Sequence, residues 1–108
     1  MRQAKDARKV ALLKKDAEHG DARAQRLLAI RYWRGRGVTQ SAELAAEWMK
    51  KAAAQAWALA QRDLAGFYQN GIGVERDTAE ALRLYRLAAG QGDPIAINFI
   101  NDMENKGG

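Results

Sequence analysis

The stretch AQRLLAIRYWRGRGV at residues 24–38 returns as AQRDLAGFYQNGIGV at residues 60–74, 36 positions later. The same offset holds on both sides, so segments 21–56 and 57–92 carry the same residue at 14 of 36 aligned positions. A repeat of this length is typical of solenoids, in which each helix pair buries its apolar face only by stacking on the next pair. The sequence therefore predicts stacked helix-turn-helix repeats.

The repeat register extends beyond these two copies. HGDARA at residues 19–24 aligns with QGDPIA at residues 91–96, two periods later. The segment before the first copy then corresponds to the second helix of a repeat, and the segment after the second copy corresponds to the first helix of another. We expect one domain over residues 1–108, made of an N-terminal half-repeat that acts as a capping helix, two full repeats and a C-terminal half-repeat: 4–20, 21–56, 57–92 and 93–105.

Composition and helix-end signals favour an all-α fold. The chain has one Pro and is rich in Ala, Leu and charged residues that favour helices. Ser41, Asp77 and Asp93 stand where a helix start needs a side-chain cap, and Gly35 and Gly71 stand where a helix end needs left-handed backbone. Six helices are expected, at about residues 4–19, 22–34, 42–55, 58–70, 78–90 and 94–105.

One face of each first helix carries the residues that we expect to pack inward. Ala, Leu and Tyr recur there at i, i+4 and i+8, which places them on one side of a helix. They are Ala24, Leu28, Tyr32, Ala60, Leu64 and Tyr68. Two positions depart from the repeat. Ala56 stands where the other junctions have Gly20 and Gly92, so the turn there must differ from the others or be strained. Trp57 replaces a capping Asp, so we expect it to be either a half-exposed contact or a packing substitute for the absent glycine.

The residues in register give the pattern A-x-x-x-L-[AG]-x-x-Y-x-x-G-x-G-V, followed by A-A-x-x-G-x-x-x-A, which resembles the Sel-like (Sel-one-like) repeat family, a relative of the tetratricopeptide repeats. The resemblance covers about residues 7–103. Ala29 and Ala65 stand where this family prefers Gly, and Leu84 stands where it prefers Trp. The resemblance implies a right-handed αα solenoid that scaffolds protein complexes, with the first helices lining a concave groove.

Residue types that catalyse reactions or bind metals are scarce. The chain has no Cys, and its one His, His19, lies at the end of the first expected helix, where it fits a cap. The glycines of GRGV and GIGV are not followed by the Lys-Ser or Lys-Thr of a phosphate-binding loop. We therefore expect no enzymatic activity, no catalytic residues, no metal site and no cofactor.

A row of Arg, Trp and amide side chains lies on the first helices, on the side away from the tyrosines. Residues spaced by three and four positions share one helix face, and Arg and Trp are enriched at binding hot spots. This row predicts a groove for an acidic peptide or an acidic protein surface. The expected partner-binding residues are Arg23, Arg26, Ile30, Trp33, Arg34, Arg62, Gln69 and Asn70.

Two other function classes remain open. Residues 1–36 carry eleven Lys or Arg and four Asp or Glu, a net charge of +7, so a nucleic-acid-binding module that uses this basic third is an alternative to the protein adaptor. The second alternative is a protein that self-assembles through its last helix, because this helix carries several apolar residues: Ile95, Ile97, Phe99 and Ile100. The charged N-terminal stretch lacks the apolar core of a signal peptide, so we expect a cytoplasmic protein without membrane contact.

Overall fold

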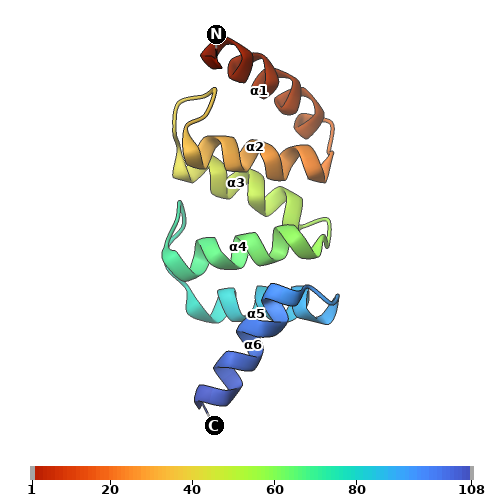
Figure 1. The fold of residues 1–108 in the computed structure, drawn as a ribbon, viewed down its shortest axis with the longest axis vertical. Coiled ribbons are helices and arrows are strands. Elements are labelled where there is room, and N and C mark those ends of the chain that lie inside the picture. The colour runs from red at the N-terminus through yellow and green to blue at the C-terminus, as the bar shows by residue number, and fades with distance from the viewer. Residues whose placement is uncertain (1, 108) are drawn as a thin grey trace.

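The computed structural model describes residues 2–107, which form six helices stacked in chain order (Figure 1). The helices are α1 (Arg2–Glu18), α2 (Ala22–Arg34), α3 (Ala42–Ala53), α4 (Ala58–Asn70), α5 (Thr78–Gly90) and α6 (Pro94–Gly107). Each helix packs mainly on the helices before and after it, and the stack measures 52 × 22 × 21 Å. The expected all-α solenoid of six helices is confirmed.

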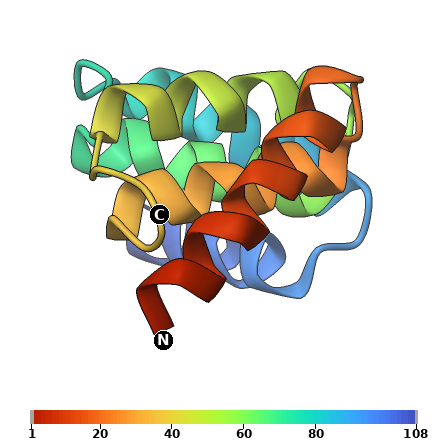
Figure 2. The ribbon, with the colours of Figure 1, turned by 90° about the horizontal axis from the view of Figure 1, so that it is seen from above.

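The stack has two layers when it is seen end-on. Figure 2 shows α3 and α5 in the upper layer and α2 and α4 below them, with α1 crossing at the near end. The first helices of the repeats therefore lie on one side of the molecule, and the second helices lie on the other. This arrangement brings α2 and α4 side by side, although α3 separates them in the sequence.

The expected caps define the helix ends. The carboxylates of Asp21 and Asp77 accept hydrogen bonds from Ala24 N and Glu80 N, each at 3.0 Å. Ser41 Oγ and Asp93 Oδ2 cap α3 and α6 in the same way. Gly35 and Gly71 adopt left-handed backbone with φ of 68°, which ends α2 and α4 and confirms their expected role.

The junction between α3 and α4 differs from its counterparts. Helix α3 ends at Ala53, two residues earlier than expected. Ala56 adopts a φ of 61°, a left-handed conformation that costs a residue with a Cβ about 1–2 kcal/mol, so the expected strain is confirmed. Trp57 makes no side-chain cap, is half-buried against the core, and lies with its ring centroid 5.9 Å from the Arg26 guanidinium.

The core follows the expected inner face, with one correction. Leu28 and Ala60 are fully buried, and Tyr32 is 8% exposed. Tyr68, expected to be equally buried, is only half-buried, and the neighbouring Phe67 takes the buried position at 4% exposed. Because Phe67 packs toward Trp33, Tyr68 remains at the edge of α4, where the Lys50 ammonium lies 5.9 Å from its ring centroid.

Within each repeat, a pair of glutamines with one buried member joins the two helices. Gln55 Nε2 donates to Gln25 Oε1 at 3.0 Å, and 36 residues later Gln91 Nε2 donates to Gln61 Oε1 at 2.9 Å. Gln25 and Gln61 are 5% and 6% exposed, so each buried amide needs such a partner. The pairs tie the end of each second helix to the first helix of the same repeat and so fix the spacing of the two layers.

Candidate functional site

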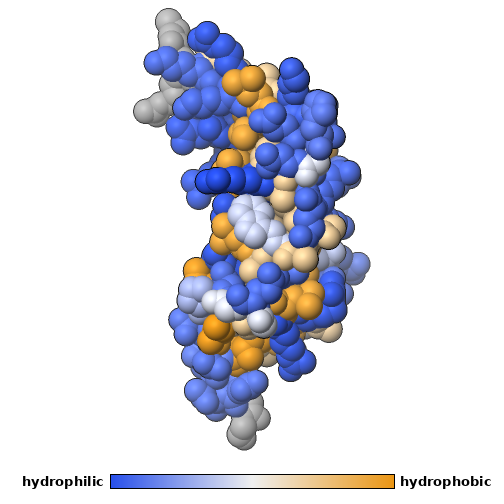
Figure 3. Space-filling view, turned by 90° about the vertical axis from the view of Figure 1, so that its right-hand side faces the viewer, coloured by the Kyte–Doolittle hydropathy of each residue, from blue (hydrophilic) through white to orange (hydrophobic). Residues whose placement is uncertain are grey.

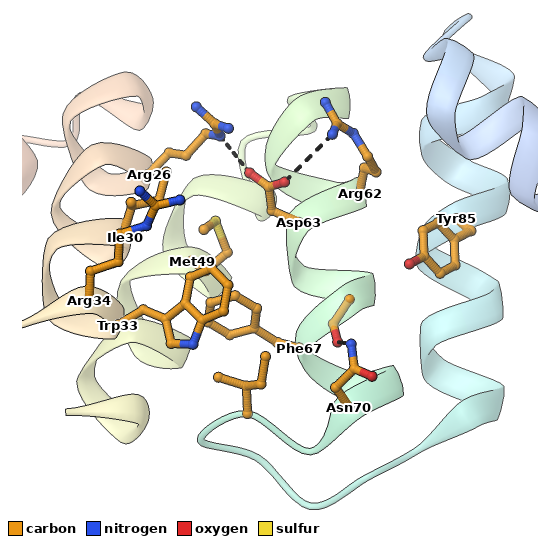
Figure 4. A pocket seen from close by; sticks show the side chains of 12 residues that line it. Arg26, Ile30, Trp33, Arg34, Met49, Arg62, Asp63, Phe67, Asn70 and Tyr85 are labelled. Atoms are coloured by element: carbon orange, nitrogen blue, oxygen red, sulfur yellow. Dashed lines mark hydrogen bonds and ion pairs between the residues drawn. The ribbon is translucent and has the colours of Figure 1, made fainter. Parts of the chain in front are cut away.

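A pocket of about 350 Å³ opens between α2 and α4 (Figure 4). We call it the α2–α4 pocket. Helix α2 contributes Arg26, Ile30, Trp33 and Arg34. Helix α4 contributes Arg62, Asp63, Gly66, Phe67 and Asn70. The remaining lining residues are Met49, Ile72 and Tyr85. Trp33 and Arg34 are the last two residues of α2, and they line the pocket together with Ile72 from the loop that follows α4.

The inner wall of the pocket is apolar and aromatic. Met49 from α3 is 1% exposed and Phe67 is 4% exposed. The ring centroids of Trp33 and Phe67 lie 5.8 Å apart at an interplanar angle of 54°, a tilted arrangement that is favourable for aromatic pairs. Trp33 itself remains 39% exposed. The pocket therefore contains a partly exposed indole that packs against a buried aromatic ring.

Charged side chains form one rim of the pocket. Arg26 Nε donates to Asp63 Oδ2 at 2.6 Å, which joins α2 to α4. On the other side, Arg62 Nε lies 3.2 Å from Asp93 Oδ2, and Arg62 Nη1 lies 3.9 Å from Asp63 Oδ1. Arg62 Nε is buried and has no hydrogen-bond partner, because its N–H is not aligned with the nearby carboxylate. This rim is thus a ladder of alternating charges across α2, α4 and the start of α6.

Asp63 is the charged pocket residue that the sequence analysis missed, and the same analysis did not include the uncharged lining residues Met49, Gly66, Phe67, Ile72 and Tyr85. Asp63 occupies the register of Leu27 in the preceding repeat, so the repeat pattern gave no indication that it would face Arg26. Its carboxylate forms ion pairs with Arg26 and Arg62 and so neutralises part of the positive charge that these arginines were expected to offer to an acidic partner. Arg34 is different, because within residues 2–107 the structure shows no ion pair for it.

Polar groups lie on the side of the pocket toward α5. The Tyr85 hydroxyl donates to Gln69 Oε1 at 3.0 Å, and Asn70 Nδ2 donates to the Gly66 carbonyl at 2.9 Å. Burial raises the pKa of Tyr85, the nearby Arg62 charge acts to lower it, and Asp63 raises it further. The hydroxyl therefore stays protonated at neutral pH and acts as a hydrogen-bond donor.

The structure brings six of the eight expected binding residues into this pocket. They are Arg26, Ile30, Trp33, Arg34, Arg62 and Asn70. Arg23 is exposed but lies outside the pocket lining. Gln69 is turned about 100° around α4 from Asn70 and serves to hold the Tyr85 hydroxyl.

Part of the positive charge of the N-terminal third is paired with a buried carboxylate inside the fold. Asp6 is 5% exposed, and its carboxylate lies 3.3 Å from Arg31 Nη1 and 3.4 Å from Arg36 Nε. Burial acts to raise the pKa of Asp6, but the hydrogen bonds and charges of Arg31 and Arg36 outweigh burial and lower this pKa below its ordinary value. These two arginines attach α1 to the stack and are less available to a polyanion.

The apolar residues of α6 divide into two groups. Phe99 and Ile100 are half-buried, and the Phe99 ring stacks on Tyr85 with a centroid distance of 3.9 Å. Ile95 and Ile97 remain exposed at 54% and 37%. On the side that carries the turns between repeats, Figure 3 shows hydrophobic residues in scattered patches among hydrophilic ones.

No helix between residues 2 and 107 combines the length and the apolar character that crossing a membrane requires. In the same part of the chain, no three His, Cys, Asp or Glu side chains gather in a way that could hold a metal ion.

Comparisons with known proteins agree with the fold. A family model described as Sel1 repeat matches residues 22–56 and 58–93. A protective antigen of uropathogenic Escherichia coli with an SLR fold superposes with a TM-score of 0.88 and 33% identity, over 94% of this chain and 22% of the antigen. A Sel1 repeat protein from Oxalobacter formigenes gives 0.82 and 40%, over 84% of this chain and 26% of that protein.

A third solved structure shares the fold at lower identity. Helicobacter pylori cysteine rich protein B has a TM-score of 0.79 and 22% identity, over 83% of this chain and 68% of that protein. No curated protein matched the chain. The coverage of the first two solved structures, 22% and 26%, means that this chain spans about a quarter of their length.

Proposed function

Because the chain belongs to the Sel1 repeat family, we propose that it binds a partner protein in the α2–α4 pocket. Sel1 repeat proteins are generally scaffolds for protein interactions. The bound part of the partner is an acidic peptide or an acidic protein surface. The chain itself supplies binding and positioning, and no chemical step.

The observation that carries this proposal is the exposed Trp33 above the buried Phe67. Exposure of an indole to water is unfavourable, and Trp is enriched at the centres of protein interfaces. Here the ring is held in place by the Phe67 contact and borders an open pocket. A partner side chain that enters the pocket would gain apolar contact with both rings without a large rearrangement of the site.

Charge supports an acidic partner, but fewer arginines contribute than the sequence suggests. Arg26 and Arg62 already lie beside Asp63. Arg34 borders the pocket and is exposed, so it is the arginine best placed to meet a carboxylate of the partner. Arg23, about three helical turns before Arg34 on α2, adds positive charge at the approach.

The test is affinity capture from the source organism with three forms of the protein. Wild type and Leu87→Ala should retain the same partner, because Leu87 is comparably exposed at 44% but does not line the pocket. Trp33→Ala should weaken binding at least about tenfold, as for a typical hot spot, with an unchanged helical circular dichroism signal. A partner that binds Trp33→Ala as tightly as wild type contradicts the proposal.

The acidic character of the partner needs a separate variant. Charge reversal of Arg26 or Arg62 is unsuitable, because the new carboxylate would lie beside Asp63 and destabilise the rim. Arg34→Glu avoids this effect and should weaken binding, and the affinity of wild type should fall as salt concentration rises. Binding that is insensitive to both changes would mean that the partner is not acidic at the contact.

A further inference from the structure

Gly66 is an unusual residue within the α2–α4 pocket. It lies in the interior of α4, where glycine weakens a helix more than any residue except proline. Its backbone is not left-handed. A Cβ added at this position would meet only the Tyr85 hydroxyl, at 3.9 Å, which is ordinary van der Waals contact. Neither backbone conformation nor close packing therefore requires glycine here.

The preceding repeat shows what the glycine removes. Ile30 occupies the same register on α2, where its half-buried side chain packs against the core and forms a wall of the pocket. On α4 the corresponding side chain is absent, so the space between Asp63 and Asn70 stays open toward Tyr85. At this position of the pocket, the second repeat thus has open space where the first repeat has a side chain.

The surroundings of this space define what fits there. Phe67 and Met49 provide a buried apolar wall, and the Tyr85 hydroxyl lies at the far side. A volume of about 350 Å³ lies at the lower end of the usual range for ligand pockets. One bulky apolar side chain of a bound peptide suits this space better than a charged one, because Arg26 and Arg62 are already neutralised by Asp63 and Asp93.

We propose that Gly66 determines specificity: it admits one bulky apolar side chain of a partner peptide, while a nearby carboxylate of the same peptide meets Arg34. This inference rests on the proposed function and names the class of peptide that the pocket takes. Gly66 acts by leaving room, so its replacement should harm binding without harming the fold.

The test begins with a random peptide library displayed on phage and selected on wild-type protein. Enriched peptides should share an aromatic or large aliphatic residue with an acidic residue a few positions away. A synthetic peptide of the enriched sequence is then titrated against wild type, Gly66→Ala, Gly66→Ile and Gly90→Ala. Gly90 is a matched control, since it is also helical, has open space around it and lies outside the pocket lining.

We expect Gly66→Ile to weaken peptide binding at least about tenfold and Gly66→Ala to weaken it less. Both Gly66→Ala and Gly90→Ala should raise the melting temperature, and Gly90→Ala should leave the affinity unchanged. If Gly66→Ala lowers the melting temperature, the glycine is structural and the inference is wrong. Peptides that bind Gly66→Ile as tightly as wild type also overturn it.

The same selection separates this inference from the proposed function. A library that yields no enriched peptide, or only peptides that bind Trp33→Ala as tightly as wild type, contradicts both the proposed function and the inference built on it. Peptides whose binding requires Trp33 but tolerates Gly66→Ile leave the pocket in place as the binding site and contradict only the role of Gly66.

Discussion

At the scale of single residues, Asp6 shows how one buried carboxylate can hold a terminal helix. It is a buried charged residue of α1, and its contacts with Arg31 and Arg36 reach the end of α2 and the loop beyond it. A buried charge is tolerated only when it is paired. The attachment of α1 therefore depends on this carboxylate remaining ionised.

This dependence predicts a loss of stability in acid. The pKa of Asp6 in the folded protein lies below its ordinary value of 3.8. The stabilisation is therefore present above 3.8 and is lost as the pH falls through the lower, folded value. Urea unfolding across this range should show a steeper acid loss for wild type than for Asp6→Asn. Equal pH dependence of the two proteins would mean that the carboxylate does not hold α1.

Tyr32 and Tyr68 occupy equivalent positions in the two repeats, and their unequal burial predicts unequal losses of stability when each is replaced. Tyr32→Ala should cost about 3–5 kcal/mol of unfolding free energy, as for other buried aromatic truncations. Tyr68→Ala should cost less than about 2 kcal/mol, because Tyr68 is only half-buried and buries less apolar area. Urea unfolding of both variants measures the two losses, and equal losses would place Tyr68 in the core after all.

At the scale of elements, the second glycine of each G-x-G loop, Gly37 or Gly73, lies where one repeat contacts the preceding one. A Cβ at Gly37 would lie 2.6 Å from the backbone of Asp6 in α1. A Cβ at Gly73 would overlap the carbonyl of Ala42 at the start of α3. Residues 6 and 42 are one repeat apart, so each loop lies against the N-terminal part of the second helix in the preceding repeat.

This contact predicts unequal effects of alanine at two glycines of one loop. Gly71→Ala should cost about 1–2 kcal/mol for its left-handed backbone alone, since its nearest neighbour is 3.6 Å away. Gly73→Ala should cost roughly 2–5 kcal/mol, because overpacking against α3 adds to the same backbone strain. Thermal or urea unfolding compares them, and a smaller loss at Gly73 would mean that the loop can move away from α3.

At the scale of the whole molecule, the chain is a row of helices in which each contacts its neighbours. Stability in such a solenoid depends on interfaces between adjacent units, so an end without a polar cap exposes apolar surface. Helix α6 leaves Ile95, Ile97 and Met103 exposed at 54%, 37% and 44%. The expected homo-oligomer through this helix stays a prediction.

Analytical ultracentrifugation tests that prediction. The mean mass of wild type should rise with protein concentration, because self-association would bury the exposed isoleucines of α6. The double variant Ile95→Lys, Ile97→Lys should remain monomeric and keep its helical signal, since neither residue belongs to the core. A wild type that stays monomeric at high concentration would contradict self-association through α6.

The sequence by itself determined the solenoid, the number of helices, most of their ends and the row of Arg and Trp side chains on one face of α2. These features depend on neighbours along the chain. Spacings of three and four residues define a helix face, and caps such as Ser41 and Asp77 act within one turn. The 36-residue register then carried each local feature from one repeat to the next.

Only the tertiary structure decided which residues meet across helices. Asp63 pairs with Arg26, 37 residues away, and Phe67 rather than Tyr68 enters the core beside Trp33. Neither contact follows from spacing, because both depend on how α2 and α4 are rotated about their axes where they pack. A small rotation moves the inward side from one residue to its neighbour, and that rotation is set by the packing of all the surrounding side chains together.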